Sequence, residues 1–281
     1  MENIQIKIQE LLKLFNSNKI AEAEILNKKL IKEFPKAIDL YNLLGLIFLK
    51  QKKATEAIKY FSLGIEIKSD YFPLYDNMGT AYRIIGKYDE AEKFFKKAIS
   101  INKKAIEPRN NLASLFSIQN KSIKAITYYK KVLSIKSDYY ITHYNLGIEY
   151  KSMGSFNDAK KHLNQALKIN KYLFQAHRAM SELTKYTKND KSYKNLEELY
   201  KNPNIKKENK TELLFALGKA SEDVKDYTKA FNYYKEGNDL RDNEVSFNLK
   251  KEIETFKQIK EVFNEKILGN NNFDKNKDKS P

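Results

Sequence analysis

Residues 76–99 read DNMGTAYRIIGKYDEAEKFFKKAI. Apolar residues recur at helical spacing on both sides of Gly86, for example at Phe94, Phe95 and Ala98 in the second half. This spacing is typical of an amphipathic helix, and the glycine interrupts it in the middle. The stretch therefore predicts two helices joined by a tight turn.

The same hairpin pattern returns along the chain every 34 residues. One column of small residues holds Ala23, Ala57, Ala91, Ala125 and Ala159, and a second column holds Gly45, Gly79, Ala113 and Gly147. A fixed period of this length indicates a solenoid of stacked helix hairpins. Small residues at the eighth and twentieth positions let the two helices approach closely, and large residues fill the groove between them. We predict an all-α, right-handed α-solenoid of about seven hairpins.

The period also predicts the domain boundaries. Residues 1–173 hold five regular units, which begin at residues 4, 38, 72, 106 and 140. A degenerate hairpin at 174–210 is expected to carry a three-residue insertion near Asn202-Pro203-Asn204, and a regular unit follows at 211–244. Residues 245–268 are expected to form a C-terminal capping helix, and residues 269–281 a disordered tail.

At this point the sequence resembles the tetratricopeptide repeat family. The resemblance lies in Leu44-Gly45…Phe48…Ala57…Phe61, Met78-Gly79…Tyr82…Ala91…Phe95…Ala98 and Leu146-Gly147…Tyr150…Ala159…Ala166. It covers most of the chain. The fourth position departs from the family, because Tyr41, Tyr75, Arg109, His143 and His177 stand where the family has Trp. The resemblance implies a scaffold that binds an extended peptide or partner protein in its concave groove.

In such a solenoid the first helix of each hairpin lines the groove. Asn77, Asn111 and Asn145 share the sixth position of successive units, and Asn42 and Asn110 share the fifth. Each amide offers donors and an acceptor, so a row of them can bind successive peptide groups of an extended chain. The row resembles the asparagine ladder of O-linked N-acetylglucosamine transferase. Basic residues expected in the groove are Arg83, Lys151 and Arg178, which favours an acidic or tyrosine-containing peptide.

The formal charge of +16 comes almost entirely from lysine, which makes up 48 of the 52 basic residues. Lysine pairs such as Lys96-Lys97 and Lys130-Lys131 fall on the outer side of the second helices, where solvent is expected. Sites that read phosphates or bases usually rely on arginine. A solvated lysine surface is therefore expected and a nucleic-acid partner is not, although a basic nucleic-acid-binding repeat protein stays open as an alternative.

Composition limits the chemistry of this chain. There is no Cys and there are three His, so no metal site, cofactor or catalytic residue is predicted. His143 and His177 share a repeat position, which favours a packing role, and His162 is expected at an exposed position. The start of the sequence has no signal-peptide pattern, and no apolar stretch is long enough to span a bilayer. No membrane partner and a cytoplasmic location are expected.

A second resemblance covers about residues 174–265. Leu214-Phe-Ala-Leu-Gly-Lys-Ala220, Asp226-Tyr-Thr-Lys-Ala-Phe231 and Glu236-Gly-Asn-Asp-Leu-Arg241 look like the repeat region that precedes the catalytic domain of bacterial sulfotransferase-family proteins. Those domains open with a Pro-Arg-Ser-Gly-Thr loop for the sulfate donor, which is absent here. The resemblance implies a substrate-presenting repeat half, either truncated or a separate chain. An enzyme active only with that missing domain attached is the main alternative.

Overall fold

The computed structural model describes residues 4–203, 205–242, 253–254 and 257–258. Within these residues the chain forms helices and no strands, so the predicted all-α solenoid of helix hairpins is confirmed. The predicted capping helix and tail lie almost wholly outside the described residues. The chain divides into two compact units, Met1–Lys185 and Tyr186–Pro281, which we call the N-terminal and C-terminal units.

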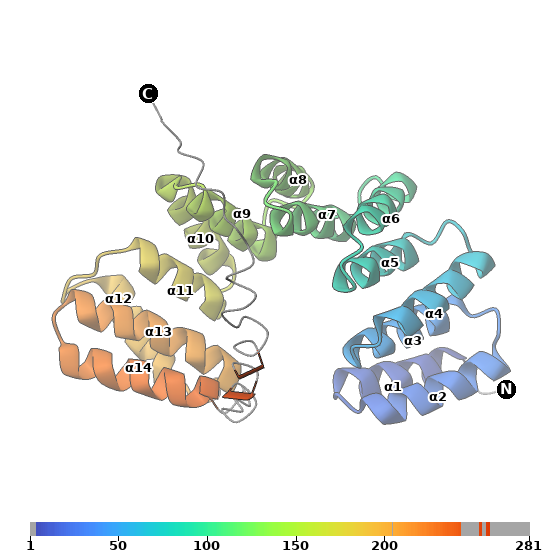
Figure 1. Ribbon diagram of the computed structural model, residues 1–281, viewed down its shortest axis with the longest axis horizontal. Helices are drawn as coiled ribbons and strands as arrows, with labels where there is room; N and C mark the ends of the chain where they lie inside the picture. Colours follow the sequence, from blue (N-terminus) through green and yellow to red (C-terminus); the bar gives the residue numbers. More distant parts are fainter. Residues whose placement is uncertain (1–3, 204, 243–252, 255–256, 259–281) are drawn as a thin grey trace, which may run out of the picture. The chain divides into compact units, whose positions relative to one another are not determined.

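Eleven helices make up the described part of the N-terminal unit (Figure 1). They are α1 (Ile4–Asn16), α2 (Ile20–Glu33), α3 (Ile38–Lys50), α4 (Ala54–Ile67), α5 (Phe72–Ile84), α6 (Tyr88–Ile101), α7 (Glu107–Ile118), α8 (Ser122–Ile135), α9 (Tyr140–Ser152), α10 (Phe156–Ile169) and α11 (Phe174–Leu183). Each odd-numbered helix up to α9 packs against the even-numbered helix that follows it. The predicted hairpins are therefore present.

The first helices of successive hairpins also touch each other. Helix α3 packs on α5, α5 on α7 and α7 on α9, whereas each second helix packs mainly on its sequence neighbours. A layer whose members lie closer together forms the inner side of a curved stack. The first helices of the N-terminal unit therefore line its inner face, as the sequence predicts.

Glycines at the eighth position explain how closely the two helices of a hairpin pack. A Cβ atom on Gly45 would lie 2.2 Å from a ring carbon of Phe61, and one on Gly79 would lie 2.7 Å from the Phe95 ring. Both phenyl rings are fully buried. The ring of the second helix thus rests directly on the glycine backbone of the first.

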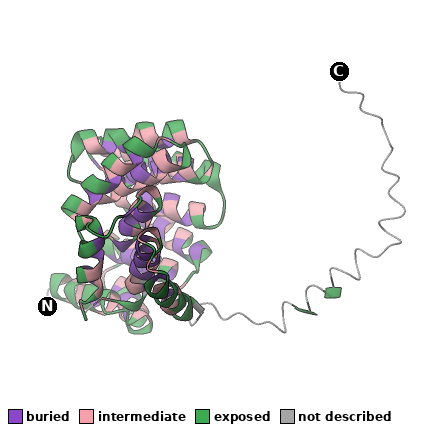
Figure 2. Ribbon diagram, turned by 90° about the vertical axis from the view of Figure 1, so that its left-hand side faces the viewer, coloured by how far each residue is buried: buried purple, intermediate pink, exposed green. Residues whose placement is uncertain are grey.

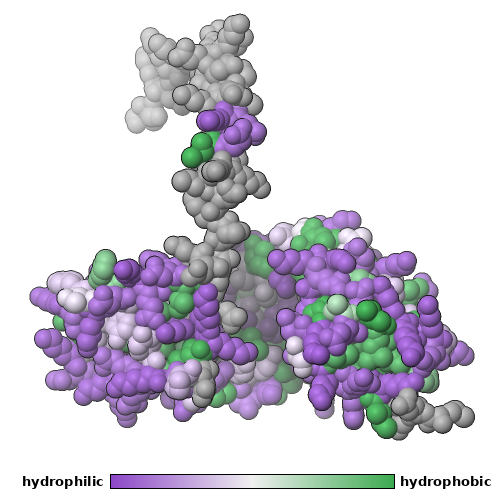
Figure 3. Space-filling view, turned by 90° about the horizontal axis from the view of Figure 1, so that it is seen from below, coloured by the Kyte–Doolittle hydropathy of each residue, from purple (hydrophilic) through white to green (hydrophobic). Residues whose placement is uncertain are grey.

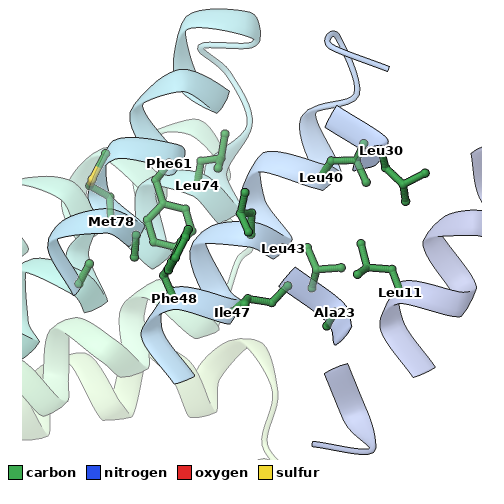
Figure 4. Packing of buried hydrophobic residues seen from close by; sticks show 13 residues of the cluster. Leu11, Ala23, Leu30, Leu40, Leu43, Ile47, Phe48, Phe61, Leu74 and Met78 are labelled. Carbon is green, nitrogen blue, oxygen red and sulfur yellow. The ribbon is translucent and has the colours of Figure 1, made fainter. Parts of the chain in front are cut away.

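Successive hairpins are joined by a continuous apolar core. Side chains of α3 point toward those of the first hairpin on one side, while Phe61 of α4 meets Leu74 of α5 on the other (Figure 4). The cluster combines Leu11, Ala23, Leu30, Leu40, Leu43, Leu44, Ile47, Phe48, Ala57, Phe61, Leu74, Met78 and Ala81. Burial of this apolar surface is the main force that holds the stack together.

The turns inside the hairpins use left-handed backbone. Gly86 and Gly154 have φ of 78° and 74°, which a glycine adopts without a steric penalty. Other hairpins place Asn18, Lys52 or Asn120 in the same conformation. The turn is therefore set by the pairing of the helices, and glycine is favoured there without being required.

The C-terminal unit contains α12 (Lys191–Tyr200), α13 (Lys207–Asp223) and α14 (Tyr227–Asp242). Helix α13 packs closely on α14, and a Cβ on Gly218 would lie 2.5 Å from the Tyr234 ring. The boundary between the two units falls between α11 and α12, within the hairpin predicted at 174–210. Asn204, at the predicted insertion, lies outside the described residues, so the extent of that hairpin stays a prediction.

Buried residues lie on the helix sides that face other helices, and exposed residues on the outer sides (Figure 2). Hydrophilic side chains cover most of the face shown in Figure 3, with hydrophobic side chains gathered in small patches. The lysine pairs Lys28-Lys29, Lys96-Lys97 and Lys130-Lys131 are all exposed on second helices. Their charge faces solvent, as predicted.

Candidate functional site

All eight residues that the sequence predicts for the groove lie on first helices of the N-terminal unit. They are Asn42 on α3, Asn77 and Arg83 on α5, Asn110 and Asn111 on α7, Asn145 and Lys151 on α9, and Arg178 on α11. Asn110 is buried and the other seven are half-buried. Their shared repeat positions place them on the same side of successive helices. Whether they bind a ligand stays a prediction.

The asparagine row is tied together by hydrogen bonds between units. Asn77 Nδ2 donates to Asn42 Oδ1 at 2.7 Å, and Asn111 Nδ2 donates to Asp76 Oδ1 at 2.9 Å. In these two units the sixth position thus binds the fifth position of the preceding unit. Asn110 Oδ1 accepts instead from the Thr142 hydroxyl at 2.9 Å. The amides are therefore held in fixed orientations before any ligand arrives.

Asp76 lies on the first helix α5 and is not among the site residues predicted from the sequence. Its side chain is buried, and desolvation raises the pKa of its carboxyl from 3.8 to about 6, with a smaller contribution from Glu107. The hydrogen bond from Asn111 acts in the opposite direction. The repeat register does identify this position, because Asp76 occupies the fifth position of its unit, as Asn42 and Asn110 do in theirs. Unlike the amides of Asn42 and Asn110, the buried carboxyl of Asp76 can gain or lose a charge as the pH changes.

Lys151 and Arg178 are already paired within the chain. Glu182 of α11 accepts a hydrogen bond from Lys151 Nζ, and its other carboxylate oxygen lies 3.7 Å from Arg178 Nε. One acidic residue therefore engages both predicted basic residues. Their combined charge is smaller than the sequence suggests.

Arg83 is in a different environment. Its Nε atom is buried and has no hydrogen-bond partner among the described residues. Nearby, the Ser114 and Asn145 side chains act on the hydroxyl of Tyr129 and lower its pKa. Burial and the charge of Glu149 raise the pKa of Tyr129, while Arg83 lowers it. These side chains come from four helices, α5, α7, α8 and α9, and they meet at the inner face.

The fourth position explains why the family's Trp is dispensable here. In five successive units its side chain donates to the backbone carbonyl six residues earlier: Tyr41 to Pro35, Tyr75 to Ser69, Arg109 to Lys103, His143 to Ser137 and His177 to Lys171. The donor–acceptor distances run from 2.5 to 2.9 Å. Tyr, Arg and His are interchangeable because each supplies a donor at the same place.

One histidine prediction is wrong. His162 is half-buried, with its Nδ1 atom 3.0 Å from Nδ1 of His143 and its ring stacked on Tyr150 at 5.6 Å. Because His143 Nε2 must donate to a carbonyl, its Nδ1 accepts the proton of His162 Nδ1. Burial and the neighbouring His143 lower the pKa of His162 to about 4. The pair stabilises the hairpin of α9 and α10.

Clustered metal ligands and membrane-spanning helices are absent from the residues that the structure describes. These residues contain no group of three or more His, Cys, Asp or Glu placed to hold a metal ion. None of their helices combines the length and apolar character that a membrane crossing requires.

Comparison with known families matches the repeat region. A tetratricopeptide repeat family model matches residues 36–104 and 70–138, and a second tetratricopeptide repeat model matches residues 140–172. These ranges cover α3 to α10, where the hairpins are most regular. A search of curated proteins finds no match.

Solved structures share the fold. PilW, described as a widely conserved type IV pilus biogenesis factor, is 15% identical, covers 84% of this chain and 97% of its own, and gives a TM-score of 0.62. TTC0263, a tetratricopeptide protein of Thermus thermophilus, is 19% identical, covers 64% of this chain and 98% of its own, and gives 0.57. PilF of Pseudomonas aeruginosa is 14% identical and covers 64% of this chain and 82% of its own, with a TM-score of 0.57.

At these identities the likeness concerns the fold alone. The repeats themselves carry the functional conclusion, because tetratricopeptide repeats bind protein or peptide partners. Together with the hairpins, the close approach at the glycines and the inner layer of first helices, the matches identify the chain as a tetratricopeptide repeat protein built as a protein–protein interaction scaffold.

Proposed function

We propose that the inner face of the N-terminal unit binds an extended segment of a partner protein. The observation that supports this most is the tethered asparagine row. Asn77 and Asn111 each donate one amide hydrogen bond to the preceding unit. Their Oδ1 atoms accept no hydrogen bond from the described residues. These oxygens are half-buried acceptors in fixed positions. A peptide N–H meets such an acceptor at a small entropic cost.

The partner segment is proposed to be acidic or to contain tyrosine. Arg83 is the basic residue that favours this composition, since Lys151 and Arg178 share Glu182. The half-buried ring of Tyr139, at the start of α9, can supply a surface on which a tyrosine ring of the partner packs. A cytoplasmic location for this interaction stays a prediction from the sequence.

A display library of random dodecapeptides tests the proposal. Peptides selected on the full chain should bind the triple variant Asn77→Ala, Asn111→Ala, Asn145→Ala at least about tenfold more weakly, because three backbone contacts are lost. The helix content should not change. Asn164→Ala is the matched control, since Asn164 is exposed on α10. Equal affinity of the triple variant and the wild type would remove the proposal.

The role as the substrate-presenting half of a sulfotransferase rests on the sequence resemblance of residues 174–265 alone. The reading frame beyond the codon of Pro281 tests it directly. A frame that continues into a Pro-Arg-Ser-Gly-Thr loop would support both this role and the enzyme alternative. A stop codon would contradict the enzyme alternative and favour a free-standing adaptor. The nucleic-acid alternative predicts binding that weakens steeply as salt is raised.

A further inference from the structure

Arg83 stands apart from the other three arginines of the chain. Those three are held by groups of the protein itself: Arg109 by the carbonyls of Lys103 and Ala105, Arg178 by Glu182, and Arg241 by the Phe215 ring. Among the described residues Arg83 has no hydrogen bond, ion pair or ring contact, and its Nε atom is buried. A buried N–H without an acceptor lowers stability. A ligand that supplies the missing acceptor would offset this loss of stability.

Polar side chains from neighbouring hairpins surround Arg83. Arg83, Ser114 and Asn145 occupy the twelfth, ninth and sixth positions of α5, α7 and α9, so they run diagonally across three neighbouring first helices. Tyr129 of α8 lies beside this diagonal, where the Ser114 and Asn145 side chains act on its hydroxyl and lower its pKa. A guanidinium, two hydroxyls and an amide thus offer several donors to one place.

We propose that Arg83 is the anchor for a carboxylate of the partner segment, with Ser114 and Asn145 as further donors. This inference rests on the proposed function, because it names the charged group that the inner face receives. A guanidinium binds a carboxylate through two parallel N–H···O bonds, which a lysine cannot reproduce. The carboxylate belongs either to an Asp or Glu side chain or to the C-terminus of the partner.

Glu149 limits how strongly the polar side chains around Arg83 attract an anion. Its side chain is 5% exposed, it accepts a hydrogen bond from the Ser117 hydroxyl, and its charge acts on Tyr129 together with that of Arg83. It forms no ion pair with Arg83 at 4.0 Å or less among the described residues. Glu149 therefore opposes an incoming carboxylate without occupying Arg83. Replacing it by Gln should tighten the binding of an acidic peptide.

The experiment uses the full chain and two libraries of random dodecapeptides, one with free C-termini and one with blocked C-termini. Selection from both libraries of peptides with an acidic residue at a fixed place indicates a side-chain carboxylate. Selection from the free library alone indicates the terminal carboxylate. The dissociation constant of the tightest peptide is then measured beside that of its amide form, in which the selected carboxylate is replaced.

Arg83→Gln should lower the affinity for the acidic peptide by about tenfold to a hundredfold. The affinity of Arg83→Lys should lie between that of Arg83→Gln and that of the wild type. Glu149→Gln should strengthen binding. Lys97→Gln, which removes one charge from an exposed second-helix position, should bind as the wild type does. The amide peptide should be insensitive to Arg83→Gln, because the contact is already lost. Helix content and melting temperature show that each variant is folded.

Two outcomes separate this inference from the proposed function. If the acidic and amide peptides lose the same factor on Arg83→Gln, or neither loses affinity, the carboxylate anchor is wrong. The asparagine variants then still report on the inner face. If no peptide is selected by the wild-type chain, both the anchor and the extended-peptide proposal are wrong.

Discussion

The two sides of the first helices in the N-terminal unit differ in their contacts: one side packs closely on the second helix, and the inner side carries polar groups. On the side that faces the second helix, Gly45 and Gly79 accept the rings of Phe61 and Phe95 with no room for a Cβ. On the inner side, Asn77 binds Asn42 of the preceding unit, while Asp76 is buried and Arg83 half-buried, and neither forms an ion pair with a residue that the structure describes. Within the described residues, the rings on the packing side find their contacts in the chain itself, whereas Arg83 on the inner side lacks an acceptor for its Nε–H group.

This difference separates stability from binding. A change on the packing side disturbs close contacts, so it should alter the free energy of unfolding and leave ligand preference alone. A change on the inner side removes a group that costs stability in the free protein, so it should alter binding and leave folding intact or improved. Each prediction below tests one side of that division.

The largest effect is expected on the packing side. Gly45→Ala should lower the free energy of unfolding by about 3 kcal/mol, because the new Cβ would overlap the buried Phe61 ring. Gly237→Ala is the matched control, since a Cβ there meets its nearest neighbour at 3.4 Å. Urea unfolding followed by circular dichroism measures both. Equal stability of the two variants would show that the glycine contact does not limit the packing.

On the inner side, Asp76→Asn should raise the stability of the N-terminal unit by about 2 kcal/mol at pH 7. Burial raises the pKa of Asp76 from 3.8 to about 6, so the folded chain holds this proton more tightly than the unfolded chain. Its contribution to stability therefore falls as the pH rises between about 4 and 6. The variant should lack this fall, and the amide oxygen still accepts from Asn111. A variant that is less stable at pH 7 would contradict the account.

The histidine pair on the packing side should show the opposite pH dependence. The pKa of His162 is lowered from 6.5 to about 4, so protonation favours the unfolded chain. Its contribution is present above about pH 6.5 and is lost as the pH falls toward about 4. His162→Phe keeps the ring stacking on Tyr150 and should flatten this part of the pH–stability curve by about 1 kcal/mol. Unchanged pH dependence would mean that the pair does not titrate in this range.

The sequence predicted the packing side well and the inner side only in part. Spacing alone identified Gly45, Gly79 and their partner rings, because both are set by the 34-residue period. Spacing also placed Arg83, Lys151 and Arg178 on the inner face. It did not reveal that Glu182 engages two of them, since that contact depends on side-chain geometry between α9 and α11.

The same limit applies to the polar columns. Tyr, Arg and His at the fourth position look unrelated in the sequence, yet Tyr75, Arg109 and His143 each donate to the equivalent carbonyl. Asp76 differs from Asn42 and Asn110 by one atom type, but burial changes its pKa strongly. Hydrogen-bond partners and burial come from three-dimensional contacts, so a repeat register identifies the position and not the role.

Mapping of backbone amide chemical shifts on the full chain, with a display-selected peptide added, tests the central claim most directly. The account predicts shifts concentrated on inner-face residues of α3, α5, α7 and α9, and a shift of the Arg83 Nε–H signal, one of only four arginine signals. Shifts confined to the second helices α4, α6, α8 and α10, or to the C-terminal unit, would contradict it.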